Sequence, residues 1–190
     1  MIAPGDGHSI VMVAPGDPTE PPVPVLEEYE RSIEAEVEKR LGPRLQAVNP
    51  IVGRVFPNFA LLRSISRTFR VWMPRGPDKM EVWAWAYIDK AAPPEVKEAA
   101  RLGVIRGFSP SGGLEQDDMD NWQECTQTCR GVVSRRQPLN TTQGLGHEGY
   151  DEAFLAYASD YRFSEVANRD FYRHWAQLMD LEPGGRRDFR

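Results

Sequence analysis

The chain has 190 residues, a length within the usual range of a single domain. It contains no run of about 18 consecutive apolar residues, so the sequence predicts no membrane-spanning helix. The 28 acidic and 23 basic residues give a net charge of -5, which argues against a nucleic-acid partner because no surplus of positive charge is available for phosphates. The two cysteines and the lack of a signal-peptide pattern at the N-terminus favour a reducing cytoplasm.

Proline and glycine dominate residues 1–24, which we interpret as an arm. Within it, only residues 8–13 have the composition of a strand, because proline has no N–H to donate to a sheet. After the arm, apolar residues recur at steps of three and four over residues 25–41, with acids at the start and bases at the end. This pattern predicts an amphipathic helix that ends at Gly42.

Three segments rich in β-branched and aromatic residues, 51–60, 64–73 and 80–88, predict an antiparallel meander whose strands are separated at Pro57-Asn58 and at residues 74–78. In residues 82–88 both alternating sets of side chains are apolar. We therefore expect a central strand there, covered on both faces.

The C-terminal half is predicted to be mainly helical. A helix is expected from Pro93 to Arg106, and the Gly- and Ser-rich residues 109–113 end it. Further helices are predicted over residues 116–130 and 164–179. Residues 137–161 show weak periodicity and are interpreted as a long loop.

Asp118 is the main candidate for chemistry. In a helix over 116–130 it shares one face with Trp122, Cys125 and Cys129, and we expect this face to point inward. An ionised carboxylate in a core is costly unless it is paired, hydrogen-bonded or bound to a cation. Asp118 is therefore either an acid that caps the helix or a metal ligand.

Other candidates for metal ligands are weaker. Cys125 and Cys129 have no third cysteine or nearby histidine, so we interpret them as small core residues. The histidines do not form a closely spaced ligand pair, and a structural role is expected for each: His8, His147 and His174. The sequence has no phosphate-binding loop, dinucleotide fingerprint or nucleophile elbow.

Five motifs occur in a fixed order between about residues 45 and 179. They are VWMPRGP (71–77), EVW (81–83), EQDD with NW (115–122), RG (130–131) and FYRHW (171–175). In this order they resemble the C-terminal half of the catalytic domain in large (alpha) subunits of Rieske-type aromatic-ring-hydroxylating dioxygenases.

This resemblance implies an α+β helix-grip (START/Bet v1-like) fold, an antiparallel sheet wrapped on a long C-terminal helix. Residues 1–190 would be the C-terminal portion of an incomplete catalytic domain, without a Rieske domain. In the family, two histidines and one aspartate hold a mononuclear non-haem Fe(II), and the aspartate position matches Asp118. Phe108 and Leu114 match positions that line the pocket for the aromatic substrate, and Ile65 and Ser66 are further candidates.

The implied activity is that of a terminal oxygenase, which converts an aromatic compound and O2 to a cis-dihydrodiol. Electrons would come from NAD(P)H through ferredoxin or reductase partners and a Rieske [2Fe–2S] cluster. The family pattern implies a homotrimer of alpha subunits and leaves open whether a beta subunit accompanies it. The histidine ligands and the cluster-binding residues would lie upstream of this sequence, so we expect the chain alone to be inactive.

Two other functions remain open at this point. The chain is alternatively a non-catalytic helix-grip binder of hydrophobic small molecules, which predicts a cavity whose Asp118 bonds only to protein. A purely structural assembly subunit predicts no cavity near Asp118.

Overall fold

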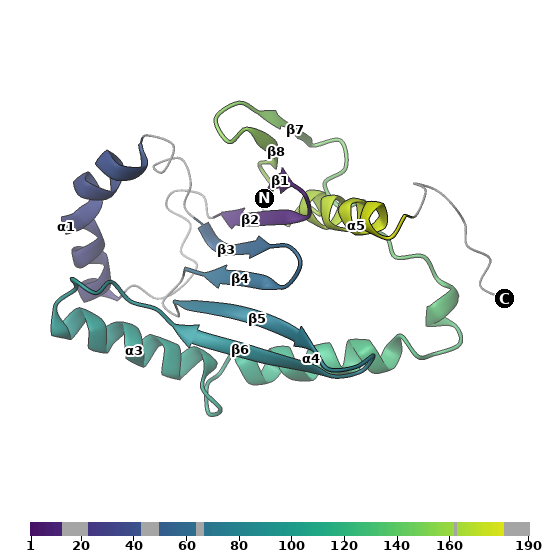
Figure 1. The fold of residues 1–190 in the computed structure, drawn as a ribbon, viewed down its shortest axis with the longest axis horizontal. Helices are drawn as coiled ribbons and strands as arrows, with labels where there is room; N and C mark the ends of the chain where they lie inside the picture. Colours follow the sequence, from purple (N-terminus) through teal and green to yellow (C-terminus); the bar gives the residue numbers. More distant parts are fainter. Residues whose placement is uncertain (13–22, 43–49, 64–66, 162, 181–190) are drawn as a thin grey trace.

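The computed structural model describes residues 1–12, 23–42, 50–63, 67–161 and 163–180 (Figure 1). They form an eight-stranded antiparallel sheet in the order β6-β5-β4-β3-β2-β1-β8-β7. Its strands are β1 (Ile2–Gly5), β2 (His8–Met12), β3 (Pro50–Val55), β4 (Phe59–Leu62), β5 (Thr68–Pro74), β6 (Met80–Ala86), β7 (Glu148–Asp151) and β8 (Ala156–Ser159). The helices are α1 (Pro24–Leu41), α3 (Pro94–Phe108), α4 (Glu115–Thr128) and α5 (Val166–Leu178), with a short 3-10 helix η1 (Ser134–Arg136). This combination confirms the predicted α+β class.

The N-terminal segment lies in the middle of the sheet. The arm over 1–24 was expected to hold one strand, yet residues 1–12 form two, β1 and β2. β1 pairs with β2 on one side and with β8 on the other. Strand β1 has only four residues, and two of them are Pro4 and Gly5, which are uncommon in strands. Its sequence therefore shows no alternating pattern that would predict a strand. Long-range pairing with β8, which no local pattern reveals, stabilises it.

Strands β3 to β6 form the predicted antiparallel meander. The segment 51–60 contributes two of these strands, which turn at the expected separator Pro57-Asn58, with Val55 paired to Phe59. Residues 137–161, expected to be a loop, contain the β7–β8 hairpin, in which Tyr150 pairs with Tyr157. Its four-residue strands are too short to show a clear alternation.

Every end of the four predicted helices lies within two residues of the end in the structure. Residues 25–41, 93–106 and 164–179 correspond to α1, α3 and α5, and residues 116–130 correspond to α4. Periodicity is sufficient here because each helix is at least 13 residues long. Helix α3, for example, buries a single stripe that includes Val96 and Ala100.

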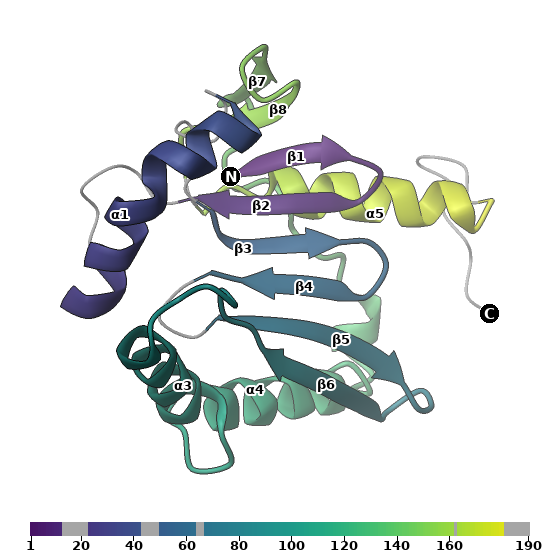
Figure 2. The ribbon, with the colours of Figure 1, turned by 60° about the vertical axis from the view of Figure 1, so that its left-hand side comes forward.

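The helices α3, α4 and α5 contact the same face of the sheet. The register aligns Arg54, Ala60 and Arg70 across β3, β4 and β5, so these side chains point to one face. On that face Arg54 lies 4.5 Å over the ring of Phe171 in α5, and Arg70 lies 3.9 Å over the ring of Phe108 at the end of α3. Figure 2 shows α5 beside β1 and β2, and α4 beside β6. The sheet therefore grips the C-terminal helix, as the resemblance predicted.

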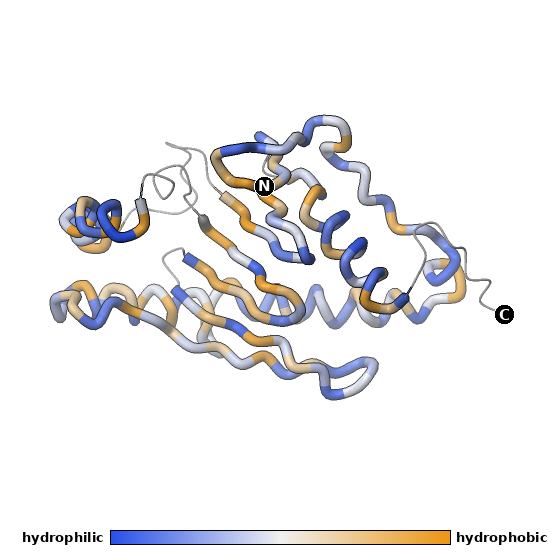
Figure 3. The backbone as a smooth tube through the Cα atoms, turned by 45° about the horizontal axis from the view of Figure 1, so that its top comes forward, coloured by the Kyte–Doolittle hydropathy of each residue, from blue (hydrophilic) through white to orange (hydrophobic). Residues whose placement is uncertain are grey.

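Strand β6 is at the end of the sheet, which corrects the prediction of a central strand. Apolar residues recur along the strands (Figure 3). Trp83 and Trp85 nevertheless remain 48% exposed. Apolar side chains on both faces of a strand therefore do not show that the strand is central. In β6, one apolar face is only partly covered by the described residues.

Most of the buried apolar residues form two small clusters. Leu26 packs with Val96 and Ala100 between α1 and α3, and Ala3 packs with Val166 between β1 and α5. No helix in the described ranges combines the length and the apolar composition needed to cross a bilayer.

Arg169 in α5 fastens the β7–β8 hairpin to the domain. Its guanidinium donates to the carbonyls of Thr141 and Gln143 and lies 2.6 Å from an oxygen of Glu148. Because both charged side chains are less than one-fifth exposed, we expect Arg169→Met to lower the free energy of unfolding by about 3 kcal/mol. Urea unfolding of the purified chain measures this value.

The matched control is Arg101→Met. Arg101 pairs with Glu98 on the exposed surface of α3, so its removal is expected to leave the unfolding curve unchanged. Equal destabilisation by the two substitutions would show that Arg169 does not hold the hairpin.

Candidate functional site

The candidate site is built on the turn between α3 and α4. The turn is closed by backbone hydrogen bonds, because the amides of Gly113 and Leu114 donate to the carbonyls of Arg106 and Gly107. Gly112 passes so close to α3 that a Cβ there would lie 2.6 Å from the carbonyl oxygen of Gly107. Only glycine fits at this position without displacing backbone. The turn thus fixes the start of α4 against the end of α3.

Asp118 is the fourth residue of α4, and its side chain is exposed. This corrects the expectation that its face points inward. On that face Trp122 is half-buried against Trp72, 6.4 Å away between ring centroids, but Cys125 and Cys129 are exposed. The spacing correctly predicted that these four residues share one face of α4. Only Trp122 on that face packs against the sheet, and the other three side chains face solvent.

The capping role for Asp118 is not supported. The N-cap residue of α4 is Leu114, and no side chain makes a capping hydrogen bond. Within the described residues, the Asp118 carboxylate has no hydrogen bond or ion pair. Its oxygens therefore remain available to a ligand from outside the described structure.

An ion pair that the sequence did not reveal is buried at the same turn. Nη2 of Arg70 lies 2.7 Å from Oε2 of Glu115, the first residue of α4, and the two side chains are 3% and 8% exposed. The guanidinium also lies over the ring of Phe108. One signal was present in the sequence, since Arg70 interrupts an otherwise apolar strand pattern, but Glu115 is 45 residues away.

The predicted pocket residues are only partly brought together. Phe108 and Leu114 flank the turn that precedes Asp118; Phe108 is half-buried and Leu114 is 51% exposed. Ile65 and Ser66 lie outside the described residues. In the described part of the chain, Phe108, Leu114 and Asp118 therefore lie close in sequence around the turn between α3 and α4.

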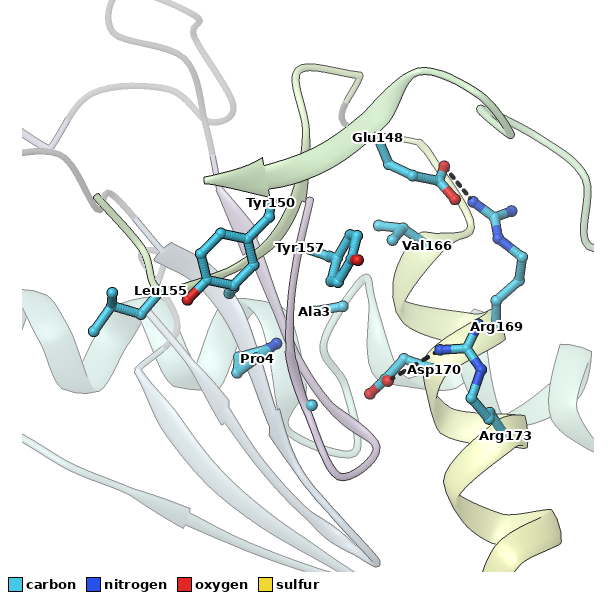
Figure 4. A pocket seen from close by; sticks show the side chains of 12 residues that line it. Ala3, Pro4, Glu148, Tyr150, Leu155, Tyr157, Val166, Arg169, Asp170 and Arg173 are labelled. Atoms are coloured by element: carbon cyan, nitrogen blue, oxygen red, sulfur yellow. Dashed lines mark hydrogen bonds and ion pairs between the residues drawn. The ribbon is translucent and has the colours of Figure 1, made fainter. Parts of the chain in front are cut away.

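A cavity of about 600 Å³ lies elsewhere, between β1, the β7–β8 hairpin and α5 (Figure 4). Tyr150, Tyr157 and Arg173 line it, together with the ion pair of Glu148 and Arg169. Its lining includes no residue of the α3–α4 turn. It is therefore separate from the candidate site.

The described residues contain no group of three or more histidine, cysteine or acidic side chains placed to hold a metal ion. Two histidines have structural contacts: Nδ1 of His8 accepts a hydrogen bond from the amide of Phe56, and the ring of His174 packs edge-on against Phe56. Among the described candidates, the exposed Asp118 carboxylate offers an oxygen of the kind that binds iron, and other residues would have to complete the ligand set.

Comparisons with known proteins agree on one family. Residues 5–181 match the family described as ring hydroxylating alpha subunit (catalytic domain). The chain is 39% identical over 145 residues to the biphenyl dioxygenase alpha subunit of Paraburkholderia xenovorans (strain LB400), which covers 75% of this chain and 31% of that protein. It is 38% identical over 126 residues to the benzene 1,2-dioxygenase alpha subunit of Pseudomonas putida, covering 66% of this chain and 28% of that protein.

The fold matches as well. The crystal structure of naphthalene 1,2-dioxygenase from Rhodococcus sp. bound to indole superimposes with a TM-score of 0.74 at 30% identity, covering 94% of this chain and 44% of that one. The chain spans about a third of the length of the curated relatives it matches. The family match over most of the sequence and the shared fold confirm the resemblance, and the chain belongs to the ring-hydroxylating alpha subunit (catalytic domain) family.

Proposed function

We propose that this chain is part of the terminal oxygenase component of an aromatic-ring-hydroxylating dioxygenase. In the proposed reaction, O2 and electrons from NAD(P)H convert an aromatic compound to a cis-dihydrodiol. The observation that carries the proposal is the Asp118 carboxylate, which has no partner within the described residues and lies four residues after Leu114 in a chain of this family. The relatives are alpha subunits of biphenyl and benzene dioxygenases, which favours an oxygenase over a non-catalytic binder of hydrophobic molecules.

Asp118 would hold a mononuclear Fe(II) as its carboxylate ligand. The family pattern places two histidine ligands outside this sequence, and the exposed side of α4 leaves room for the segment that carries them. Bound iron in a two-histidine-one-carboxylate site supplies the redox chemistry that activates dioxygen. A chain with one ligand of three holds iron weakly, so the isolated chain is expected to be inactive.

Phe108 and Leu114 would shape the substrate pocket. Both are apolar and flank the turn before Asp118, so they would exclude water and hold an aromatic ring beside the carboxylate. Ile65 and Ser66 remain candidates for the same lining. Leu114 is smaller than an aromatic side chain and would leave a wider pocket.

The proposed partners follow from the same assignment. A Rieske [2Fe–2S] cluster would come from another stretch of polypeptide, in a homotrimer from the neighbouring alpha subunit. Ferredoxin and reductase proteins would deliver the electrons, and a beta subunit is a candidate partner. The proposed location is the cytoplasm.

The test uses an assembled subunit, in which this chain follows the upstream part of the P. xenovorans relative in place of that protein's own matching segment. With electron donors and biphenyl, benzene or naphthalene, we expect oxygen uptake and a dihydrodiol that contains two atoms of ¹⁸O from ¹⁸O2. The chain without the upstream part is expected to give neither. A folded assembled subunit that binds arenes but takes up no oxygen would contradict the proposal and favour the hydrophobic binder.

A further inference from the structure

Arg70, on strand β5 of the sheet, contacts both helices that flank the candidate site, the end of α3 and the start of α4. It is 3% exposed, although its side chain carries a full charge. Its guanidinium contacts the ring of Phe108 at the end of α3, 3.9 Å from the centroid, and the carboxylate of Glu115 at the start of α4. Its Nε lies 3.3 Å from Oγ1 of Thr68 on the same strand, to which it donates. One side chain therefore links β5, α3 and α4.

The link acts on Asp118 through the helix. Glu115 and Asp118 are three residues apart in the first turn of α4, so their side chains are neighbours on the helix surface. A shift of Glu115 would also displace Asp118, because backbone hydrogen bonds such as that from the amide of Asp118 to the carbonyl of Leu114 hold this turn together. Further along α4, Trp122 packs against Trp72 and limits the tilt of the helix.

The geometry of the pair argues against a role limited to stability. Nη2 of Arg70 and Oε2 of Glu115 approach to 2.7 Å, but neither atom makes a well-directed hydrogen bond within the described residues. Burial of two charges costs desolvation, which the attraction between them offsets only when hydrogen bonds complete the pair. Apolar residues of similar size often give the same or greater stability at such a site. What they do not provide is a charge contact that holds the start of α4 close to β5.

We propose that Arg70 and Glu115 are positioning residues for the iron ligand Asp118, and that Arg70 also fixes the pocket residue Phe108. This rests on the proposed function, in which Asp118 holds iron. Neither side chain is expected to touch the metal or the substrate. Their effect is to set the distance between the carboxylate ligand and the apolar wall.

The test compares three variants in the assembled subunit. R70M/E115L replaces the pair with apolar side chains of similar size. R70K keeps the charge but loses the planar guanidinium that lies over Phe108 and contacts Glu115. E98L/R101M is the control, because it removes an ion pair of the same type from the exposed surface of α3. The readouts are the rate of iron loss to an Fe(II) chelator, hydrogen exchange of residues 115–122, and the melting temperature.

R70M/E115L and R70K are expected to lose iron about 10-fold faster than the parent and to exchange faster over 115–122, at a nearly unchanged melting temperature. The E98L/R101M control is expected to match the parent. Parental iron retention in R70M/E115L would overturn the proposal. The proposal would also be overturned if R70M/E115L and R70K both lost iron faster but also both melted at a lower temperature. A pair that only stabilises the fold would behave in this way.

An Asp118→Ala variant measured beside them separates this proposal from the proposed function. If Asp118→Ala retains iron, the proposed function is wrong. If Asp118→Ala loses iron while R70M/E115L keeps it, the function stands and the positioning role is wrong.

Discussion

Asp118→Ala in the assembled subunit is expected to abolish stable iron binding and to lower turnover by more than about 100-fold, since loss of a direct ligand exceeds the 10- to 100-fold effect of losing a residue that only supports one. The fold is expected to remain intact. The carboxylate is exposed and has no hydrogen bond or ion pair within the described residues, so its removal breaks no contact there. Metal content and the melting temperature of the purified protein measure the two effects.

Asp117→Ala is the matched control for this substitution. Asp117 is the adjacent acid in the first turn of α4, is also exposed, and lies about 100° around the helix from Asp118. Its replacement removes the same charge from the same turn but is expected to leave iron content at the parental level. Equal loss in both variants would indicate that the local negative charge, and not a specific ligand, retains the metal.

Gly112→Ala is expected to produce the largest change in stability at the site. The added Cβ would lie 2.6 Å from the carbonyl oxygen and 2.7 Å from the carbonyl carbon of Gly107, and 2.9 Å from the amide nitrogen of Phe108. These are backbone atoms, so the turn must open to accept the methyl group. We expect the free energy of unfolding to fall by about 2–3 kcal/mol in a urea titration.

Gly113→Ala provides the comparison, because a Cβ at residue 113 would meet no atom within 4 Å. Its unfolding free energy is expected to change by less than about 0.5 kcal/mol. Since the turn also sets the separation of Phe108 and Asp118, Gly112→Ala is expected to weaken iron retention as well. Identical unfolding curves for the two variants would contradict the close approach of the turn to α3.

The sequence predicted helices better than strands, for a physical reason. A helix such as α5 makes its backbone hydrogen bonds locally, and its apolar stripe is visible along all 13 of its residues. The strand β1 depends on β8, which follows more than 150 residues later, and β7 and β8 are only four residues long. No local window contains the partner that makes these segments strands.

The geometry around Asp118 was predicted in part, and its role as an iron ligand stays a prediction. Periodicity placed Asp118 with Trp122 on one face of α4, and the order of motifs assigned it to the family's ligand position. The direction of that face was wrong, because a pattern of spacing does not reveal which segments cover a helix. The pairing of Arg70 with Glu115 was missed, since it depends on how β5 and α4 meet in space.

Anomalous diffraction at the iron edge from crystals of the assembled subunit would locate the metal. If Asp118 is the carboxylate ligand, we expect an iron peak within coordination distance of one of its oxygens, with Phe108 and Leu114 on the wall beside it. An iron peak held entirely by other residues, with Asp118 in solvent, would contradict this assignment.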